Sequence, residues 1–323
     1  MLQQGRQTAE RITQEVRKVV RGLDGVIEEV LVAYFSRGHV LLEGVPGTAK
    51  TLLARALSQS IAREFKRLQF TPDLMPVDII GTRVFDLATR TFHFRPGPVF
   101  TEVLLADEIN RTPPKTQAAL LEAMQERRVT VDGDPLPLSD SFFVVATQNP
   151  LEFEGTFPLP ESQLDRFMLK VKVPYPDEEA EVQVLEQHHK GFRMTAGPIP
   201  GVSRVASEED LQAGFEAAAE VKVHQDLMRY VAAIIRRTRQ MPSLVLGASP
   251  RAGVNLLAAA KALSMMRGRS YVTPDEIKHM AGPVLRHRLI LRPEAEMEAQ
   301  TVEIVLEEVF KKVEVPRLTD ADA

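Results

Sequence analysis

The spacing of hydrophobic and polar residues changes along the chain at a segment rich in glycine and proline, 191–206. Before this segment, short apolar runs alternate with stretches in which apolar residues recur every three or four positions. After it, the helical spacing dominates. Strand and helix patterns that alternate are typical of a parallel sheet covered by helices. We therefore expect an α/β core at 1–190, a linker at 191–206 and an all-helical domain at 207–323.

The core is expected to contain five strands. The run 103–106 is apolar throughout, which suits a strand buried on both faces of a parallel sheet. The other strands are predicted at 39–43, 65–70, 142–146 and the end of 161–173. Helices are predicted at 6–21, 26–36, from 52 to about 63, from 112 to about 126, and at 177–190.

Two further segments between these elements contain turns. Residues 84–94 predict two short strands around a polar turn, and residues 129–133 predict a strand that enters a turn. In the C-terminal part, Ser249 and Thr273 each precede a proline and are expected to begin helices. A final helix is expected at about 295–312, within an acidic tail that frays from Glu294 onward.

Composition excludes several classes of protein. The chain of 323 residues has a net charge of −4, so its bulk charge gives no reason to expect nucleic-acid binding. It has no cysteine, which excludes disulfides and cysteine-based zinc sites. No apolar run approaches the length of a membrane span, and residues 1–20 lack the apolar core of a signal peptide. We expect a cytoplasmic protein without a membrane span.

The segment 44–51 is the clearest chemical signal. It reads Gly-Val-Pro-Gly-Thr-Ala-Lys-Thr and lies between a predicted strand and a predicted helix, which is the setting of a phosphate-binding loop. Lys50 is expected to contact the β- and γ-phosphates of ATP, and Thr51 to bind Mg²⁺. A non-binding turn is the alternative. The loop residues expected to hold the nucleotide are Gly44, Val45, Pro46, Gly47, Thr48, Ala49, Lys50 and Thr51.

Polar residues follow two other predicted strands. Asp107 and Glu108 come directly after 103–106, where ligands bind in open α/β sheets. We expect Asp107 to hold Mg²⁺, through water, and Glu108 to polarise the attacking water. Asn149 follows 142–146 and is expected to contact that water or the γ-phosphate, or to form a turn before Pro150.

These stretches resemble the MoxR family of AAA+ ATPases over nearly the whole chain. The resemblance rests on the loop, in which Ala49 fits the family pattern, and on Leu-Leu-Ala-Asp-Glu-Ile-Asn-Arg at 104–111. It also rests on Ala-Thr-Gln-Asn-Pro at 146–150 and Gln-Leu-Asp-Arg-Phe at 163–167. Further matching stretches are 70–74, 113–123 and 248–251. The resemblance implies a AAA+ core with a C-terminal helical lid.

The resemblance also implies roles by position. The segment 44–51 would be the Walker A motif, Asp107 and Glu108 the Walker B pair, and Asn149 sensor 1. Arg166 would be the arginine finger and Arg251 sensor 2, acting in cis or in trans. The family forms rings, usually hexamers, and works as a chaperone-like machine on client proteins. Its partners are often proteins with a von Willebrand factor A domain.

A geometric expectation accompanies the role of Arg166. The superfamily places the last core strand at the side of the sheet far from the phosphate loop, so Arg166 should reach the ATP of a neighbouring subunit. A structural ion pair between Asp165 and Arg166 is the alternative.

Four functions compete on the sequence alone. They are a protein remodeller, a magnesium-chelatase-type motor subunit, a DNA-acting motor and a small-molecule P-loop kinase. The hairpin turns carry Arg90 against Asp132 and Asp134, which disfavours a track for a polyphosphate. Phe92 and Phe94 could contact a client or pack in the core, and residues 19–23 could contact adenine or simply pack.

Overall fold

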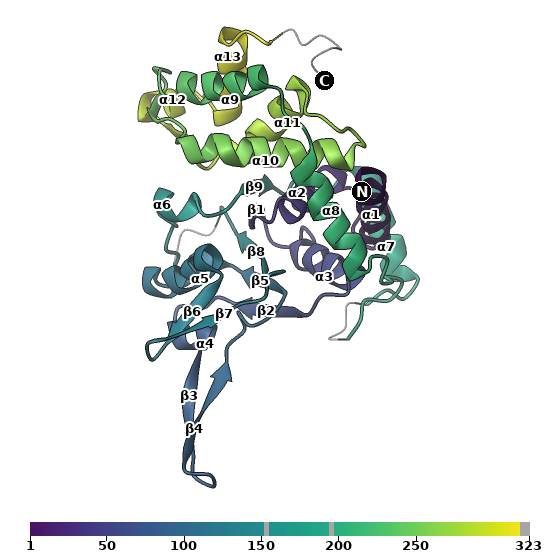
Figure 1. Cartoon of the computed structure of the whole chain (residues 1–323), viewed down its shortest axis with the longest axis vertical. Helices are drawn as coiled ribbons and strands as arrows, with labels where there is room; N and C mark the ends of the chain where they lie inside the picture. The colour runs from purple at the N-terminus through teal and green to yellow at the C-terminus, as the bar shows by residue number, and fades with distance from the viewer. Residues whose placement is uncertain (152–154, 194–196, 317–323) are drawn as a thin grey trace.

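The computed structural model describes residues 1–151, 155–193 and 197–316 (Figure 1). Its centre is a parallel sheet with the strand order β2-β5-β8-β1-β9. The strands are β1 (Val40–Glu43), β2 (Phe65–Gln69), β5 (Val103–Asp107), β8 (Phe143–Gln148) and β9 (Leu169–Lys172). All five predicted core strands are present, and their carboxyl ends share one edge of the sheet.

Alternate residues of the central strands enter two different hydrophobic clusters. In β5, Val103 and Leu105 face one cluster, whereas Leu104 and Ala106 face the other. Successive side chains of a strand point to opposite faces, so a strand buried on both sides must be apolar throughout. This explains why the run at 103–106 could be recognised as a core strand from its sequence.

Helices cover both faces of the sheet (Figure 1). The N-terminal helices α1 (Leu2–Arg17) and α2 (Asp24–Phe35) share a cluster with α3 (Lys50–Ser60), the helix that follows the loop. On the other face lie α4 (Pro76–Ile80) and α5 (Pro114–Glu126). The remaining elements of this part are η1 (Ile109–Arg111), α6 (Glu161–Leu164) and α7 (Glu178–His189).

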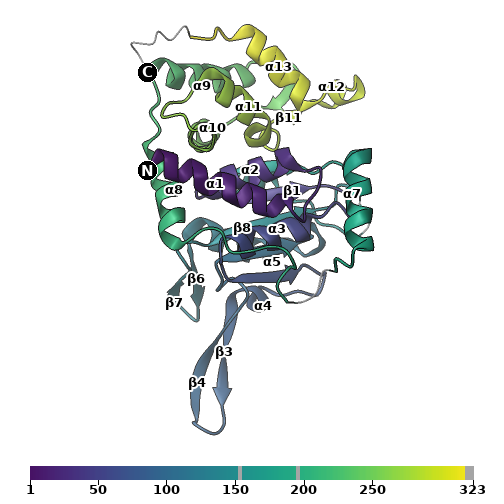
Figure 2. The same ribbon diagram turned by 90° about the vertical axis from the view of Figure 1, so that its right-hand side faces the viewer.

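Both predicted hairpins are present. The first pairs β3 (Gly81–Asp86) with β4 (Thr91–Pro96) and projects from the body of the molecule, as Figures 1 and 2 show. The second pairs β6 (Arg128–Val131) with β7 (Asp134–Pro137). Asp132 and Gly133 both have positive φ, at 52° and 90°, as tight hairpin turns require.

The C-terminal part is helical, as expected. It contains α8 (Glu208–Glu220), α9 (Gln225–Thr238), α10 (Pro250–Met266), α11 (Pro274–Leu285), α12 (Pro293–Met297) and α13 (Val302–Lys312). The predicted starts of α10 at Ser249 and of α11 at Thr273 agree with the structure. A short antiparallel pair, β10 (Leu244–Leu246) with β11 (Ile290–Leu291), adds to the predicted all-helical arrangement.

Two expectations about the tail were wrong. The predicted helix at 295–312 is two helices, because the chain breaks at Ala299, which has a φ of 55°. The segment from Glu294 to Val313 is ordered and does not fray, because α13 buries Val305, Leu306 and Val309 in the main core, while the part of this expectation that concerns 317–323 lies outside the described residues.

The helical part and the core are in close contact. Helix α8 packs along α1, and α10 contacts both α1 and α2. Residues of these helices belong to one hydrophobic cluster with one face of the sheet. The proposed boundaries at 190 and 206 stay a prediction. Among the described residues, no helix is long and apolar enough to cross a membrane.

Candidate functional site

A cavity of about 830 Å³ lies at the edge where the carboxyl ends of β1, β5 and β8 meet. Its lining brings together the loop segment 46–51 with Asp107, Glu108 and Asn149, which are far apart in the sequence. The parallel pairing of β5 and β8 with each other, and of β8 with β1, causes this convergence. The cavity is therefore the place where the predicted phosphate and metal groups can act together.

The loop before α3 has the backbone shape that anion binding requires. Gly47 has a φ of 85° and Ala49 a φ of 58°, so the chain curls in the left-handed region at two positions. Helix α3 begins at Lys50, and the first N–H groups of a helix have no partner within it. These groups, together with the positive end of the helix, favour an anion at this point.

Lys50 is held by its own loop. Its Nζ donates to the carbonyl oxygens of Gly44 and Val45, both at 2.7 Å. Burial lowers the pKa of Lys50, and the nearby carboxylates of Asp107 and Glu108 oppose part of that shift. Gly44 and Val45 thus orient the lysine, and Lys50 itself faces the cavity.

The acid pair is bound by several protein groups. Thr147 Oγ1 donates to Asp107 Oδ1 at 2.6 Å and accepts from the backbone N–H of Glu108 at 2.9 Å. Arg67 donates to Asp107 Oδ2 through Nε at 3.0 Å and Nη2 at 2.7 Å. Gln69 Nε2 donates to Glu108 Oε2 at 2.6 Å. Both carboxylates therefore have defined orientations at the end of β5.

Glu108 also has an unusual backbone. Its φ is 57°, in the left-handed region that residues with a Cβ rarely adopt. Such strain is concentrated at functional sites, where it aims a side chain that a relaxed backbone would point elsewhere. The strand ends at Asp107, and this turn at Glu108 separates the two neighbouring carboxylates.

Asn149 makes the predicted turn interaction, while its contact with a water molecule or the γ-phosphate stays a prediction. Its Oδ1 accepts from the backbone N–H of Leu151 at 3.1 Å, which is the turn interaction predicted before Pro150. The residue is also buried and lines the cavity. Its amide nitrogen is the donor with which it could contact a phosphate or a water molecule.

Part of the cavity lining is apolar. It includes Val19 and Leu23, from the segment before α2, and Val184, Leu185 and Phe192, from α7 and the residues after it. Val19 and Leu23 are also buried core residues, so the interpretation that 19–23 simply packs in the core is supported. A flat, apolar base suits an apolar lining of this kind, and contact of 19–23 with adenine stays a prediction.

Arg166 lies outside the cavity, and the expected reason was wrong. Strand β9 is the edge strand next to β1, so it is not at the side of the sheet far from the loop. Its register pairs Val40 with Leu169, which puts Arg166 before the amino end of β9, whereas the loop follows the carboxyl end of β1. The length of the strands, and not the width of the sheet, separates Arg166 from its own loop.

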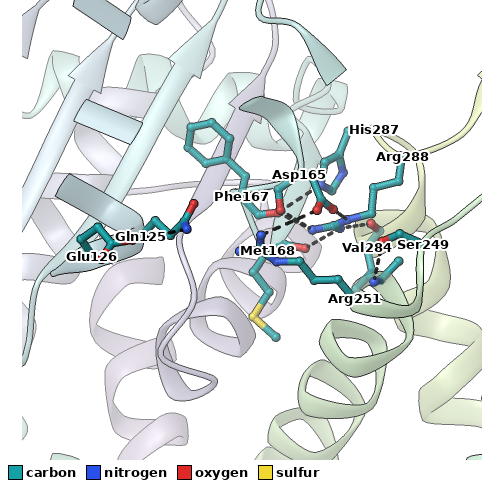
Figure 3. A network of polar contacts seen from close by, with 11 residues as sticks. Gln125, Glu126, Asp165, Phe167, Met168, Ser249, Arg251, Val284, His287 and Arg288 are labelled. Atoms are coloured by element: carbon teal, nitrogen blue, oxygen red, sulfur yellow. Dashed lines mark hydrogen bonds and ion pairs between the residues drawn. The ribbon is translucent and has the colours of Figure 1, made fainter. Parts of the chain in front are cut away.

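The expected alternative for Arg166, an ion pair with Asp165, is also wrong. In the described part of the chain, the Asp165 carboxylate pairs with Arg288 at 2.6 Å and with Arg251 at 3.9 Å (Figure 3). Arg166 instead borders a separate hollow that includes Glu122 and Glu126 of α5.

Arg251 lies in the first turn of α10, as its position after Ser249 and Pro250 predicted. Its side chain is half exposed and is not part of the cavity lining. Whether it acts in cis or in trans therefore stays open.

Comparisons with known proteins agree with this geometry. Residues 39–169 match the model of the ATPase family associated with various cellular activities (AAA), and 236–309 match an AAA lid domain. Chaperone MoxR1 of Mycobacterium tuberculosis is 43% identical over 96% of this chain and 83% of its own length. Protein MoxR of Methylorubrum extorquens is 32% identical over 98% of this chain and 97% of its own.

The chain belongs to the MoxR family of AAA+ ATPases. A crystal structure from Cytophaga hutchinsonii, described as that of a candidate ATPase, supports the fold independently. It superimposes with a TM-score of 0.89 at 38% identity and covers 98% of this chain and 97% of its own. The AAA+ core with a helical lid is thereby confirmed as the fold class.

The residues of this MoxR-family site fit a nucleotide with Mg²⁺. In the described ranges, no group of three or more Asp, Glu or His side chains is placed to hold a metal by itself. A magnesium ion bound through phosphates, water and one or two protein oxygens needs no such group. Thr51 and Asp107 line the same cavity and are the residues that would supply those oxygens.

Sequence reasoning assigned no role to four polar residues that contact the acid pair, namely Arg67, Gln69, Thr147 and Arg111, whose Nη1 donates to Glu108 Oε2 at 3.1 Å. Arg67 and Gln69 lie on β2, which pairs with β5 so that Gln69 is opposite Asp107. Thr147 is the last buried residue of β8. A possible signal was the alternate spacing of Arg67 and Gln69, which puts both side chains on one face of the strand. That signal becomes specific only when the neighbour of β2 is known.

Proposed function

We propose that this MoxR-family protein hydrolyses ATP to ADP and phosphate with Mg²⁺ at the cavity around Lys50. The observation that carries the proposal is the convergence of a curled, lysine-bearing loop and an acid pair in one cavity. Phosphoryl transfer depends mainly on positioning and charge stabilisation, and this arrangement supplies both. A bound Mg²⁺ would neutralise charge that develops on the phosphate oxygens.

Each residue then has a separate task. Pro46 to Thr51 would surround the phosphates, Lys50 would contact the β/γ oxygens, and Thr51 and Asp107 would hold the metal. Glu108 accepts a proton from the attacking water, and Gln69 holds the carboxylate of Glu108 in position. Asn149 donates its amide to that water or to the γ-phosphate.

We further propose a homo-oligomeric ring, hexameric as is usual in the family. In a ring, each subunit contacts the next through two different faces. Arg166, which lies away from its own loop, would act as the arginine finger on the ATP of the neighbour. An arginine in this role typically contributes on the order of 10³-fold or more in rate.

The work of the ring is proposed to be chaperone-like remodelling or maturation of client proteins. The M. tuberculosis relative, Chaperone MoxR1, is named as a chaperone, which supports this. A partner with a von Willebrand factor A domain is expected from the resemblance. The β3–β4 hairpin exposes Phe85, Leu87 and Phe92, which suits contact with a protein better than with a polyphosphate. This favours the remodeller over a DNA motor, and a magnesium-chelatase-type subunit remains the alternative.

The variant Glu108→Gln tests the proposed reaction. It retains the shape of the side chain and its contact with Gln69 but removes the base, so ATP and Mg²⁺ should still bind. Turnover should fall roughly 10²-fold or more, the scale of general-base loss. Asp107→Asn should instead weaken Mg²⁺-dependent affinity.

The measurements are steady-state phosphate release and calorimetric ATP binding. Glu216→Gln, at an exposed position on α8, is the control for a lost carboxylate. A wild-type protein that releases no phosphate would refute ATP hydrolysis, and wild-type turnover in Glu108→Gln would place the base elsewhere.

A further inference from the structure

A buried arginine outside the cavity makes an unusually complete set of contacts. Arg288 follows the end of α11, and only 3% of its side chain is exposed. Its Nε donates to Asp165 Oδ1 at 2.6 Å. Its Nη2 donates to the carbonyls of Asp165 at 3.1 Å and Phe167 at 2.7 Å. Its Nη1 donates to the carbonyls of Met168 at 3.1 Å and of Val284 (Figure 3).

These contacts surround the proposed arginine finger. Asp165 precedes Arg166 in the chain, and Phe167 and Met168 follow it, so Arg288 holds the backbone on both sides of Arg166. Neighbours of Arg288 extend the contact, since His287 Nε2 lies 3.1 Å from the Phe167 carbonyl. His287 and Arg288 of the lid thus hold residues 165–168, the segment directly before β9.

Only an arginine can make this set of contacts. A guanidinium has five N–H donors in a rigid fork, and all five have partners here. A lysine has three donors on one atom and cannot span acceptors on several sides. A buried cation without such partners would be strongly destabilising, so the segment around Arg166 and Arg288 must stay together.

The same carboxylate also reaches the start of α10. Asp165 Oδ1 accepts from Arg288, while Asp165 Oδ2 lies 3.9 Å from Arg251 Nη1. Two lid helices, α10 and α11, are therefore connected to the residue directly before Arg166. A displacement of the lid would be transmitted to Arg166 through these contacts.

We propose that Arg288 is a positioning residue that couples the lid of each subunit to the arginine finger Arg166, and so to ATP hydrolysis in the neighbouring subunit. The inference rests on the proposed function, because it needs Arg166 to act on the neighbour's ATP. The lid of a subunit would then affect the ATP site of the neighbouring subunit as well as any effect it has on the ATP site of its own subunit.

The test separates an effect on the neighbour from general damage. Arg288→Gln should leave ATP affinity near wild type, because Arg288 lies outside the cavity lining. Its kcat should fall on the order of 10²-fold, the scale of a misplaced catalytic group. Arg288→Lys, which retains the charge, is a second variant should Arg288→Gln not fold, and it should show the same defect. Arg292→Gln is the matched control, because Arg292 donates to a lid carbonyl, that of Pro242, away from Arg166.

Mixed rings then decide where the defect acts. The Arg288 variant is co-expressed with Lys50→Ala, each with a different affinity tag, and complexes that carry both tags are purified. Where the loop of the Arg288 variant meets the intact finger of a Lys50→Ala subunit, activity should return. That pairing describes about a quarter of the interfaces in a random ring. Mixed rings of Arg166→Ala and Lys50→Ala should regain activity to the same extent.

Three outcomes would overturn the proposal. The first is an Arg288→Gln or Arg288→Lys protein with normal kcat. The second is a defect that mixing does not repair although the Arg166→Ala mixture recovers, which would place the effect of Arg288 within its own subunit and leave the proposed function standing. The third is normal hydrolysis by Arg166→Ala, which would remove the proposed finger itself and with it the role of Arg288.

Discussion

Lys50 is the residue whose replacement tests nucleotide binding most directly. It is held by the carbonyls of Gly44 and Val45, and it is the cation that lines the cavity within the loop. Lys50→Ala should therefore nearly abolish ATP binding. Calorimetry measures this directly, with Lys115→Ala, at an exposed position on α5, as the control. An ATP affinity equal to wild type would refute the assignment of the loop.

Arg67 permits a prediction about the metal. It donates twice to Asp107 Oδ2, and an arginine and Mg²⁺ are both cations that bind the same carboxylate. Arg67→Ala should remove this competition, so half-maximal ATP hydrolysis should need several-fold less Mg²⁺. A magnesium titration of the steady-state rate measures the effect, with Arg95→Ala, an exposed residue of β4, as the control. An unchanged or higher requirement would mean that Arg67 orients Asp107 instead.

At the residue scale, sequence reasoning found what is encoded locally. The segment 44–51 and the acid pair each follow a strand directly, so their place at the edge of the sheet followed from a short stretch of sequence. Arg67, Gln69 and Thr147 could not be assigned in this way. Their contacts depend on which strand lies beside β5, and strand order is a property of the whole sheet.

At the scale of elements, most strands and helices were predictable from their apolar spacing, but their neighbours were not. The position of β9 beside β1 was missed because no local pattern encodes strand order. The two phenylalanines of β4 also differ. Phe94 packs against the core and Phe100, as the packing reading expected, whereas Phe92 is 67% exposed and contacts Phe85. Both side chains lie on the same face of β4, but Phe92 pairs with Phe85 near the turn of the projecting hairpin, whereas Phe94 pairs with Arg83 nearer its base, so one interpretation could not serve for both.

The interface of α2 with α11 predicts a dependence of stability on pH. Burial raises the pKa of Glu29 to about 7, while Arg286 and His279 oppose the shift and Glu28 adds to it. Glu29 Oε2 is buried without a hydrogen-bond partner. The folded protein therefore binds a proton here that the unfolded chain releases above its ordinary pKa. Stability should fall as pH rises from about 4.5 to about 7, and the loss should persist above that range.

Glu29→Gln should remove this penalty. At pH 8 the variant should be more stable than wild type by up to roughly 3 kcal/mol, the equivalent of the shift. The difference should shrink as the pH approaches 4.5, where the unfolded carboxyl also becomes protonated. Thermal unfolding across pH measures this, with Glu307→Gln, at an exposed position on α13, as the control. Equal stability of variant and wild type at pH 8 would mean that Glu29 titrates normally.

At the scale of the whole molecule, the phosphate loop and Arg166 lie at opposite ends of neighbouring strands. Such an arrangement cannot complete a site within one subunit but can do so across a ring contact, where unlike faces meet. The family resemblance suggested a finger that acts across a ring contact. The register of β1 with β9 gives the reason why Arg166 is remote from its own loop, and its action on a neighbouring subunit stays a proposal.

The most direct test of this shared site is ATP hydrolysis by mixed rings of Arg166→Ala and Lys50→Ala subunits, purified through a different tag on each. Either variant alone should be nearly inactive, because the first lacks the finger and the second lacks the loop. In mixed rings, the interfaces that pair an intact loop with an intact Arg166 should restore part of the wild-type rate. Mixed rings that stay as inactive as the single variants, or an Arg166→Ala protein that hydrolyses ATP normally, would contradict a site shared between subunits.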